Sequence, residues 1–323
     1  MAARITRDSL ERHQVWAYLA AIALGLGLGS VAPGLARTLD GLVWPLLALL
    51  LFVTFTQIKL ADLPVAFKDT RFVAAVLAGN FVVLPFLVWG LLALAPNDPA
   101  IRFGLVLVLL VPCTDWFVTF AHQAGGDTAR AVSITPILLL AQMLCLPLYL
   151  WGFLGVGGLA PAAVQRMALV FAVIIVVPIA LAFLIARWAG DRAKRKRAVA
   201  RLGALPVPLL ALVLFLITAS QVEIVMRARH LFGPIMVVCL VFLAGAVVLA
   251  LAIGKLFRLP LTQSRTLLFS MSTRNSFVVL PFALALPADQ QAAAIVVVLQ
   301  SLVELLGMLV LLWLVPKRLL RQH

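Results

Sequence analysis

Residues Leu110–Phe120, LVPCTDWFVTF, place a proline and an acid inside an apolar run. The run from Ile101 to Ala121 is long enough to cross a bilayer, at about 1.5 Å per helical residue against a hydrocarbon core of about 30 Å. Pro112 has no amide hydrogen and its ring crowds the preceding turn, so we expect the helix to break there. Asp115 follows, and a carboxylate at this depth needs a partner or a wet cavity. The stretch therefore predicts an interrupted membrane helix at a functional site.

A second stretch, Ser270–Pro281 (SMSTRNSFVVLP), repeats this pattern late in the chain with Arg274 and Asn275. Two interrupted spans in corresponding places are typical of the substrate site of a secondary transporter.

The composition indicates an all-α polytopic membrane protein. Hydrophobic residues make up 64% of the chain and charged residues 12%, whereas soluble chains are about 45–50% apolar and about 25% charged. The net charge of +14 predicts no nucleic-acid partner, because the basic residues lie at the ends of apolar spans. No HExxH, CxxC, P-loop or GxSxG motif is present, so we expect neither an enzyme, nor a cofactor, nor a metal centre.

The apolar runs predict ten transmembrane helices with both termini in the cytoplasm. Of the 26 Lys and Arg residues, 20 then lie on inner segments, five on outer segments, and Arg274 within a span. This asymmetry satisfies the positive-inside rule and predicts the inner (plasma) membrane. The basic run Gly190–Arg201 is either a topology anchor or an anionic-lipid site. The runs lie near residues 15–35, 41–60, 72–95, 101–121, 131–155, 162–188, 203–222, 231–257, 262–287 and 291–315.

The position of the two interruptions predicts two inverted five-helix repeats, 1–160 and 161–323, within one membrane domain. They divide at the Gly-rich turn GVGGLAP. An odd number of spans inverts the second copy. The interrupted helices become the fourth and the ninth.

Asp115, Arg274 and Glu304 are the ionisable residues deep within spans. Gln300 shares a helix face with Glu304. A carboxyl group in apolar surroundings can take up and release a proton, as a proton-coupled transporter requires; the alternative is a Glu304 that only locks helix packing. Asp115 and Arg274 have opposite charges at equivalent places, so they form a salt bridge, contact the solute directly, or both.

Cys113 lies at the first break, between Pro112 and Thr114. A soft sulfur at an opened backbone suits a thiophilic solute. The alternative is an inert buried thiol, which is how we interpret Cys145 and Cys239.

These motifs resemble the bile acid:sodium symporter superfamily, and within it the arsenical-resistance permeases. Their Pro-Cys-Thr motif matches Pro112–Thr114, their tenth-span glutamate matches Glu304, and their Asn-rich ninth-span motif corresponds less closely to Thr273–Ser276. The resemblance implies that discontinuous fourth and ninth helices cross, and that arsenite leaves in exchange for protons. Asp115-Trp116 and Arg274 depart from the usual residues, which indicates a divergent branch.

We therefore predict a proton-coupled exporter of arsenite or a similar trivalent metalloid, working by alternating access in the lipid bilayer. We expect H⁺ rather than Na⁺, because the sodium pattern of the fourth span is missing. The alternatives are a sodium- or proton-coupled transporter of a small organic anion bound at Arg274, and a membrane sensor without flux. The oligomeric state stays open. We expect solute contacts from Cys113, Thr114, Asp115, Trp116, Arg274, Asn275 and Ser276, proton coupling by Glu304 and Asp115, and supporting oxygens from Gln300 and Thr135.

Overall fold

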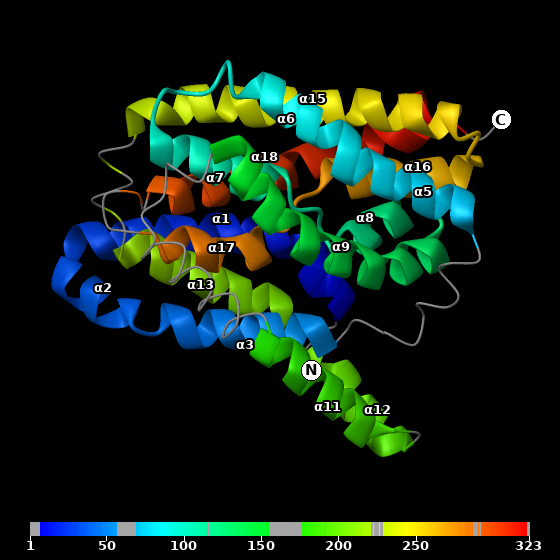
Figure 1. Cartoon of the computed structure of the whole chain (residues 1–323). Coiled ribbons are helices and arrows are strands. Elements are labelled where there is room, and N and C mark those ends of the chain that lie inside the picture. The colour runs from blue at the N-terminus through cyan, green and yellow to red at the C-terminus, as the bar shows by residue number, and fades with distance from the viewer. Residues whose placement is uncertain are drawn as a thin grey trace. The chain divides into compact units, whose positions relative to one another are not determined.

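The computed structural model is helical throughout the part of the chain that it describes (Figure 1). Apolar helices suit a membrane protein because each helix satisfies its own backbone hydrogen bonds. The described residues are 7–56, 69–114, 116–154, 176–190, 192–220, 222, 226, 229–286, 290 and 292–321.

The helices form two compact units, and neither unit is continuous in the sequence. Unit 1 comprises residues 1–57, 161–230 and 280–287, and unit 2 comprises residues 58–160, 231–279 and 288–323. In unit 1 the helices are α1 (Arg7–Val31), α2 (Pro33–Asp40), α3 (Val43–Thr56), α11 (Val177–Ala189), α12 (Ala193–Leu202) and α13 (Pro206–Ser220). In unit 2 they are α5 (Thr70–Ala78), η2 (Gly79–Val83), α6 (Leu84–Leu91), α7 (Pro99–Leu109), α8 (Trp116–Gln123), α9 (Thr128–Leu154), η4 (Arg229–Leu231, which begins in unit 1), α15 (Phe232–Leu256), α16 (Leu261–Ser272), α18 (Ala292–Leu314) and η6 (Val315–Leu319). Helix α17 (Ser276–Leu284) begins in unit 2 and ends in unit 1.

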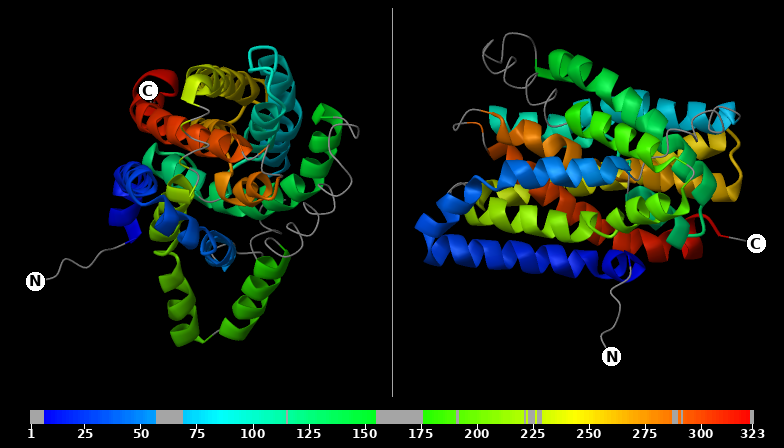
Figure 2. Two further views of the ribbon diagram at one scale, coloured as in Figure 1. Left: turned by 90° about the vertical axis from the view of Figure 1, so that its left-hand side faces the viewer. Right: turned by 90° about the horizontal axis from the view of Figure 1, so that it is seen from below.

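Unit 1 is held together by the close packing of α1 on α13. A Cβ atom at Gly25 would lie 2.4 Å from the Phe215 carbonyl oxygen, and one at Gly29 would lie 2.4 Å from the Ala219 carbonyl oxygen. The Gly25–Gly29 spacing is the small-residue pattern that lets two membrane helices approach backbone to backbone. The same unit carries the basic helix α12, which forms a hairpin with α11 (Figure 2).

Unit 2 contains both interruptions and Glu304. Helix α7 packs along α18, and α15 packs against α16 and α18. At Gly104 of α7 a Cβ atom would lie 2.8 Å from the Ala293 carbonyl oxygen and 2.9 Å from the Val296 Cβ. This missing side chain lets α18, which carries Glu304, lie directly against α7.

We expect Gly104→Ala to destabilise the fold by about 1–3 kcal/mol, the usual cost of overpacking a tight contact. The matched control is Gly90→Ala in α6, where an added Cβ would meet no atom within 4 Å. Thermal unfolding of the purified proteins in one detergent measures both variants. Equal melting temperatures for the two variants would contradict the close approach of α7 and α18.

Multiple apolar helices confirm that the chain is a multi-pass membrane protein. Among the described residues, five helical segments are long and apolar enough to cross a membrane: Thr70–Leu91, Thr128–Leu150, Ala193–Ser220, Phe232–Leu256 and Ala292–Leu319. Shorter apolar helices include Trp16–Val31, Val43–Thr56, Pro99–Leu109 and Ala180–Ala189. The ten-helix inverted repeat, its division near residue 160 and the cytoplasmic termini stay predictions.

Candidate functional site

The first predicted interruption is confirmed. Helix α7 ends at Leu109, and α8 begins at Trp116. Pro112 lies in the break and cannot donate a backbone hydrogen bond. Asp115 lies outside the described residues, so its predicted roles in solute binding and proton coupling stay predictions.

The second predicted interruption is confirmed as well. Helix α16 ends at Ser272, Thr273 is extended (φ −111°, ψ 142°), and α17 begins at Ser276. The Asn275 Oδ1 atom accepts a hydrogen bond from the Val278 backbone N–H at 3.2 Å. Asn275 thus caps the new helix, a role for which asparagine is among the preferred residues.

The two interruptions meet and pair like two short antiparallel strands, whereas the crossing of a fourth and a ninth helix stays a prediction. Pro112 and Arg274 form the antiparallel bridge. The Cys113 N–H donates to the Thr273 carbonyl at 3.2 Å, and the Asn275 N–H donates to the Val111 carbonyl at 2.8 Å. Each break thereby satisfies backbone groups that the other exposes, as non-helical backbone at membrane depth requires.

Side chains extend this crossing, which we define as residues 110–114 together with residues 273–275. The Asn275 Nδ2 atom donates to the Thr114 hydroxyl at 3.1 Å. Cys113 is 1% exposed and Thr114 3% exposed. The crossing therefore brings four predicted solute-binding residues together in a buried environment: Cys113, Thr114, Arg274 and Asn275.

Glu304 of α18 reaches the same place. Its carboxyl is buried, and Oε2 accepts hydrogen bonds from the Arg274 backbone N–H and from Gln300 Nε2, each at 2.7 Å. Trp116, the first residue of α8, lies close enough to the carboxyl to interact with it. Glu304 is therefore hydrogen-bonded to the backbone of the second interruption.

A hydrogen-bonded group of side chains links Glu304 to the start of α17. The Ser276 hydroxyl donates to Gln300 Oε1 at 3.3 Å, and the Ser301 hydroxyl lies 2.6 Å from the Ser276 hydroxyl. Gln300 and Ser276 thus lie next to Glu304, and their roles as supporting and solute-binding residues stay predictions. Thr135 is buried in α9, and its hydroxyl donates to the Ala131 carbonyl of its own helix at 3.0 Å.

Arg274 is the largest fully buried side chain among the residues that the structure describes, and it lies at the centre of the crossing. Its guanidinium donates to Asn80 Oδ1 and to three backbone carbonyls, and it stands 5.4 Å from the centre of the Phe242 ring. Among the described residues, no carboxylate lies within 4.0 Å of this guanidinium; the ion pairs found there belong to Arg130. The predicted pairing of Arg274 with Asp115 falls outside what the structure describes.

Asn80 is a site residue that the sequence analysis missed. It lies in the π-helical turn η2, is fully buried, and donates from Nδ2 to the Val76 carbonyl and the Ser270 hydroxyl at 3.1 and 3.2 Å. An amide side chain within the apolar run VLAGNFVVLP was a visible signal, because a polar group in a span needs a partner. The sequence did not show that the partner of Asn80 is Arg274.

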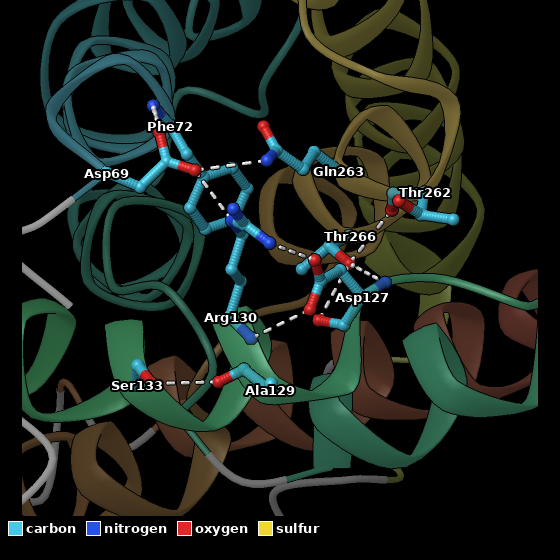
Figure 3. Close-up of polar contacts among 9 residues, drawn as sticks. All are labelled: Asp69, Phe72, Asp127, Ala129, Arg130, Ser133, Thr262, Gln263 and Thr266. Atoms are coloured by element: carbon cyan, nitrogen blue, oxygen red, sulfur yellow. Dashed lines mark hydrogen bonds and ion pairs between the residues drawn. The ribbon is translucent and has the colours of Figure 1, made fainter. Parts of the chain in front are cut away.

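A second polar cluster, also missed, joins α5, α9 and α16 at their ends (Figure 3). The Arg130 Nε atom donates to Asp69 Oδ2 at 2.6 Å, and its Nη1 atom pairs with Asp127. The Gln263 side chain donates to Asp69 at 3.0 Å, and the Thr266 hydroxyl accepts from the Asp127 N–H at 2.8 Å. These contacts fix the position of α16, and hence of the second interruption, relative to α5 and α9.

Asp69 makes the stability of this cluster dependent on pH. Burial by itself raises the pKa of Asp69, but hydrogen bonds from the Arg130 side chain, the Phe72 N–H and Gln263 outweigh it, so the pKa is lowered from its ordinary value. A carboxyl whose pKa is lower in the folded state stabilises that state above its unfolded pKa of about 3.9. This stability is lost as the pH falls through the folded pKa.

We therefore expect Asp69→Asn to lower the melting temperature at neutral pH and to lower it progressively less below about pH 4, where the wild-type carboxyl becomes protonated. Thermal unfolding of both proteins across this pH range is the measurement. A melting difference that is the same at every pH would show that the ionised Asp69 contributes nothing.

The sequence model described as the Sodium Bile acid symporter family matches residues 44–228, more than half of the chain. The matched range covers the first interruption, whereas Arg274 and Glu304 lie beyond it. No curated protein matches the chain.

Proposed function

Because the chain belongs to the Sodium Bile acid symporter family, a family of membrane transporters, we propose that it exports arsenite or a similar trivalent metalloid in exchange for protons. Membership supports a transporter that moves a small solute across a lipid bilayer. The solute and the coupling ion are our proposal, and they rest on the residues of the crossing.

The proposal rests on one observation: Cys113 and Glu304 are hydrogen-bonded to two consecutive residues of the crossing, Thr273 and Arg274. The Cys113 N–H bonds to the Thr273 carbonyl, and the Glu304 carboxyl bonds to the N–H of Arg274. The thiol suits a soft, thiophilic solute, and the carboxyl can carry a proton. The residue proposed to bind the solute and the residue proposed to carry the proton are therefore bonded to the same segment, as coupled transport requires.

The same geometry gives a physical route for coupling. An ionised carboxylate makes hydrogen bonds roughly twice as strong as a neutral one. Ionised Glu304 therefore holds the Arg274 N–H firmly, and protonation weakens this bond. Because Arg274 lies in the strand-like pairing with Pro112, a proton on Glu304 loosens the segment that presents Cys113. In this mechanism the two interrupted helices rearrange to expose the solute to alternate sides.

An organic anion bound at Arg274 has weaker support. The guanidinium is fully buried and already donates to four protein oxygen atoms. An anion would have to displace these partners, which leaves buried carbonyl groups unsatisfied.

The test is arsenite accumulation in inside-out vesicles with an imposed pH gradient. We expect uptake that follows the pH gradient and does not respond to a sodium gradient of equal size. Vesicles from cells that lack the protein provide the background. An absence of arsenite and antimonite flux, with folded protein present, would overturn the metalloid proposal, and flux driven only by sodium would overturn the proton coupling.

A further inference from the structure

The ligands of the Arg274 guanidinium are all oxygen atoms that the protein supplies. Nη2 donates to Asn80 Oδ1 at 2.9 Å, to the Ser270 carbonyl at 3.1 Å and to the Met271 carbonyl at 2.7 Å. Nη1 donates to the Leu109 carbonyl at 3.3 Å. Three backbone carbonyl oxygens and one amide oxygen thus surround one positive charge. Among the described residues, no carboxylate lies within 4.0 Å of this guanidinium.

These oxygens come from positions where a helix presents negative potential. Leu109 is the last residue of α7, and Ser270 and Met271 lie in the last turn of α16. The final carbonyls of a helix have no partner in their own helix and form the negative end of its dipole. Two such ends converge on the guanidinium, and Asn80 adds a third oxygen source from η2.

This is the kind of arrangement that holds a mobile cation in other secondary transporters. In such proteins, unwound carbonyls and the C-terminal ends of half-helices coordinate the transported Na⁺. Carbonyl and amide oxygens are the ligands that hard cations prefer. Here the oxygens do not fit a free ion, because a side chain of the protein fills the space among them.

We infer that the guanidinium of Arg274 is a tethered cation in an oxygen-lined cation site, so that this chain needs no sodium ion there. The inference deepens the proposed function, because it states which group supplies the positive charge at the crossing. That group is a side chain of the protein, whereas the family description names sodium. A plain structural anchor would bind the same carbonyls. The two cases differ in what happens when the charge is removed, because only a cation site regains its charge from solution.

The experiment is a comparison of Arg274→Ala with the wild type by thermal unfolding in sodium, potassium or choline chloride, at about 0.15 M of each salt. We expect the wild type to melt at one temperature in all three salts. In Arg274→Ala the shortened side chain leaves the four oxygens and an open space. We expect sodium to raise its melting temperature above that in choline by about 2–5 °C, if the salt concentration is about ten times the dissociation constant.

Two matched variants distinguish the effect of losing the positive charge from the effect of the space left by the shortened side chain. Arg274→Met fills the space without a charge, and Arg274→Lys keeps the charge, so neither should respond specifically to sodium. A sodium response in Arg274→Ala that is no larger than in the wild type and in Arg274→Met would overturn the inference.

If Arg274→Ala folds only when it is produced in sodium, that result supports the inference. If it folds in no salt although Arg274→Met folds, sodium has not replaced the lost charge and the inference is overturned. The readout contains no solute, so failure of this test is distinct from failure of arsenite transport.

Discussion

Glu304→Gln abolishes proton-driven arsenite accumulation, bringing it to the level of vesicles without the protein; this is the largest effect that we expect. The substitution keeps the size of the side chain and an oxygen that can accept from the Arg274 N–H. The amide cannot bind and release a proton, so the cycle stops at one protonation state. The measurement is arsenite uptake into inside-out vesicles with and without a pH gradient.

The control for Glu304→Gln is Asp98→Asn, the same acid-to-amide change at the far end of α7. Asp98 caps that helix through the Ile101 N–H at 3.0 Å, and asparagine caps a helix equally well. We expect Asp98→Asn to retain uptake. If Glu304→Gln still accumulates arsenite against the same gradient, Glu304 serves packing only and the coupling proton is carried elsewhere.

Cys113→Ala reduces arsenite uptake at least about tenfold, which corresponds to a lost contact of about 1.4 kcal/mol. Alanine keeps the backbone pairing of residue 113 with Thr273 because that pairing uses only main-chain atoms. The expected loss therefore reports the sulfur and not the crossing. Initial rates at several arsenite concentrations, measured in the same vesicles, give the change.

The matched control is Cys239→Ala, a second buried thiol, which lies in α15. It removes a thiol of similar burial from a helix that contains neither interruption, so we expect uptake close to that of the wild type. Equal rates for Cys113→Ala and Cys239→Ala would show that no sulfur contacts the solute. Combined with a loss in Glu304→Gln, that result would point to a proton-coupled carrier of a solute that is not thiophilic.

Local chemistry explains which parts of the site could be predicted. Pro112 breaks its helix because it lacks an N–H, whatever surrounds it. The charged and amide groups of Arg274 and Asn275 mark the second break because such groups are costly in a span. The contact between Glu304 and Gln300 followed from their spacing on one helix face. These properties belong to single residues or single helices, so the sequence alone carries them.

The partners of these residues depend on contacts between distant segments. The predictions that Arg274 pairs with Asp115, contacts a solute, or both remain untested. In the described structure Arg274 binds Asn80, 194 residues away, and the ends of two helices. The Asp69 and Arg130 cluster was missed for the same reason, because its members come from different helices. A multi-pass helical membrane protein with two interrupted helices and a buried glutamate follows from the amino-acid sequence. The pairing of the interruptions, and the place of Arg274 among the oxygen atoms at their centre, depend on how the helices pack, because packing brings particular helix ends together.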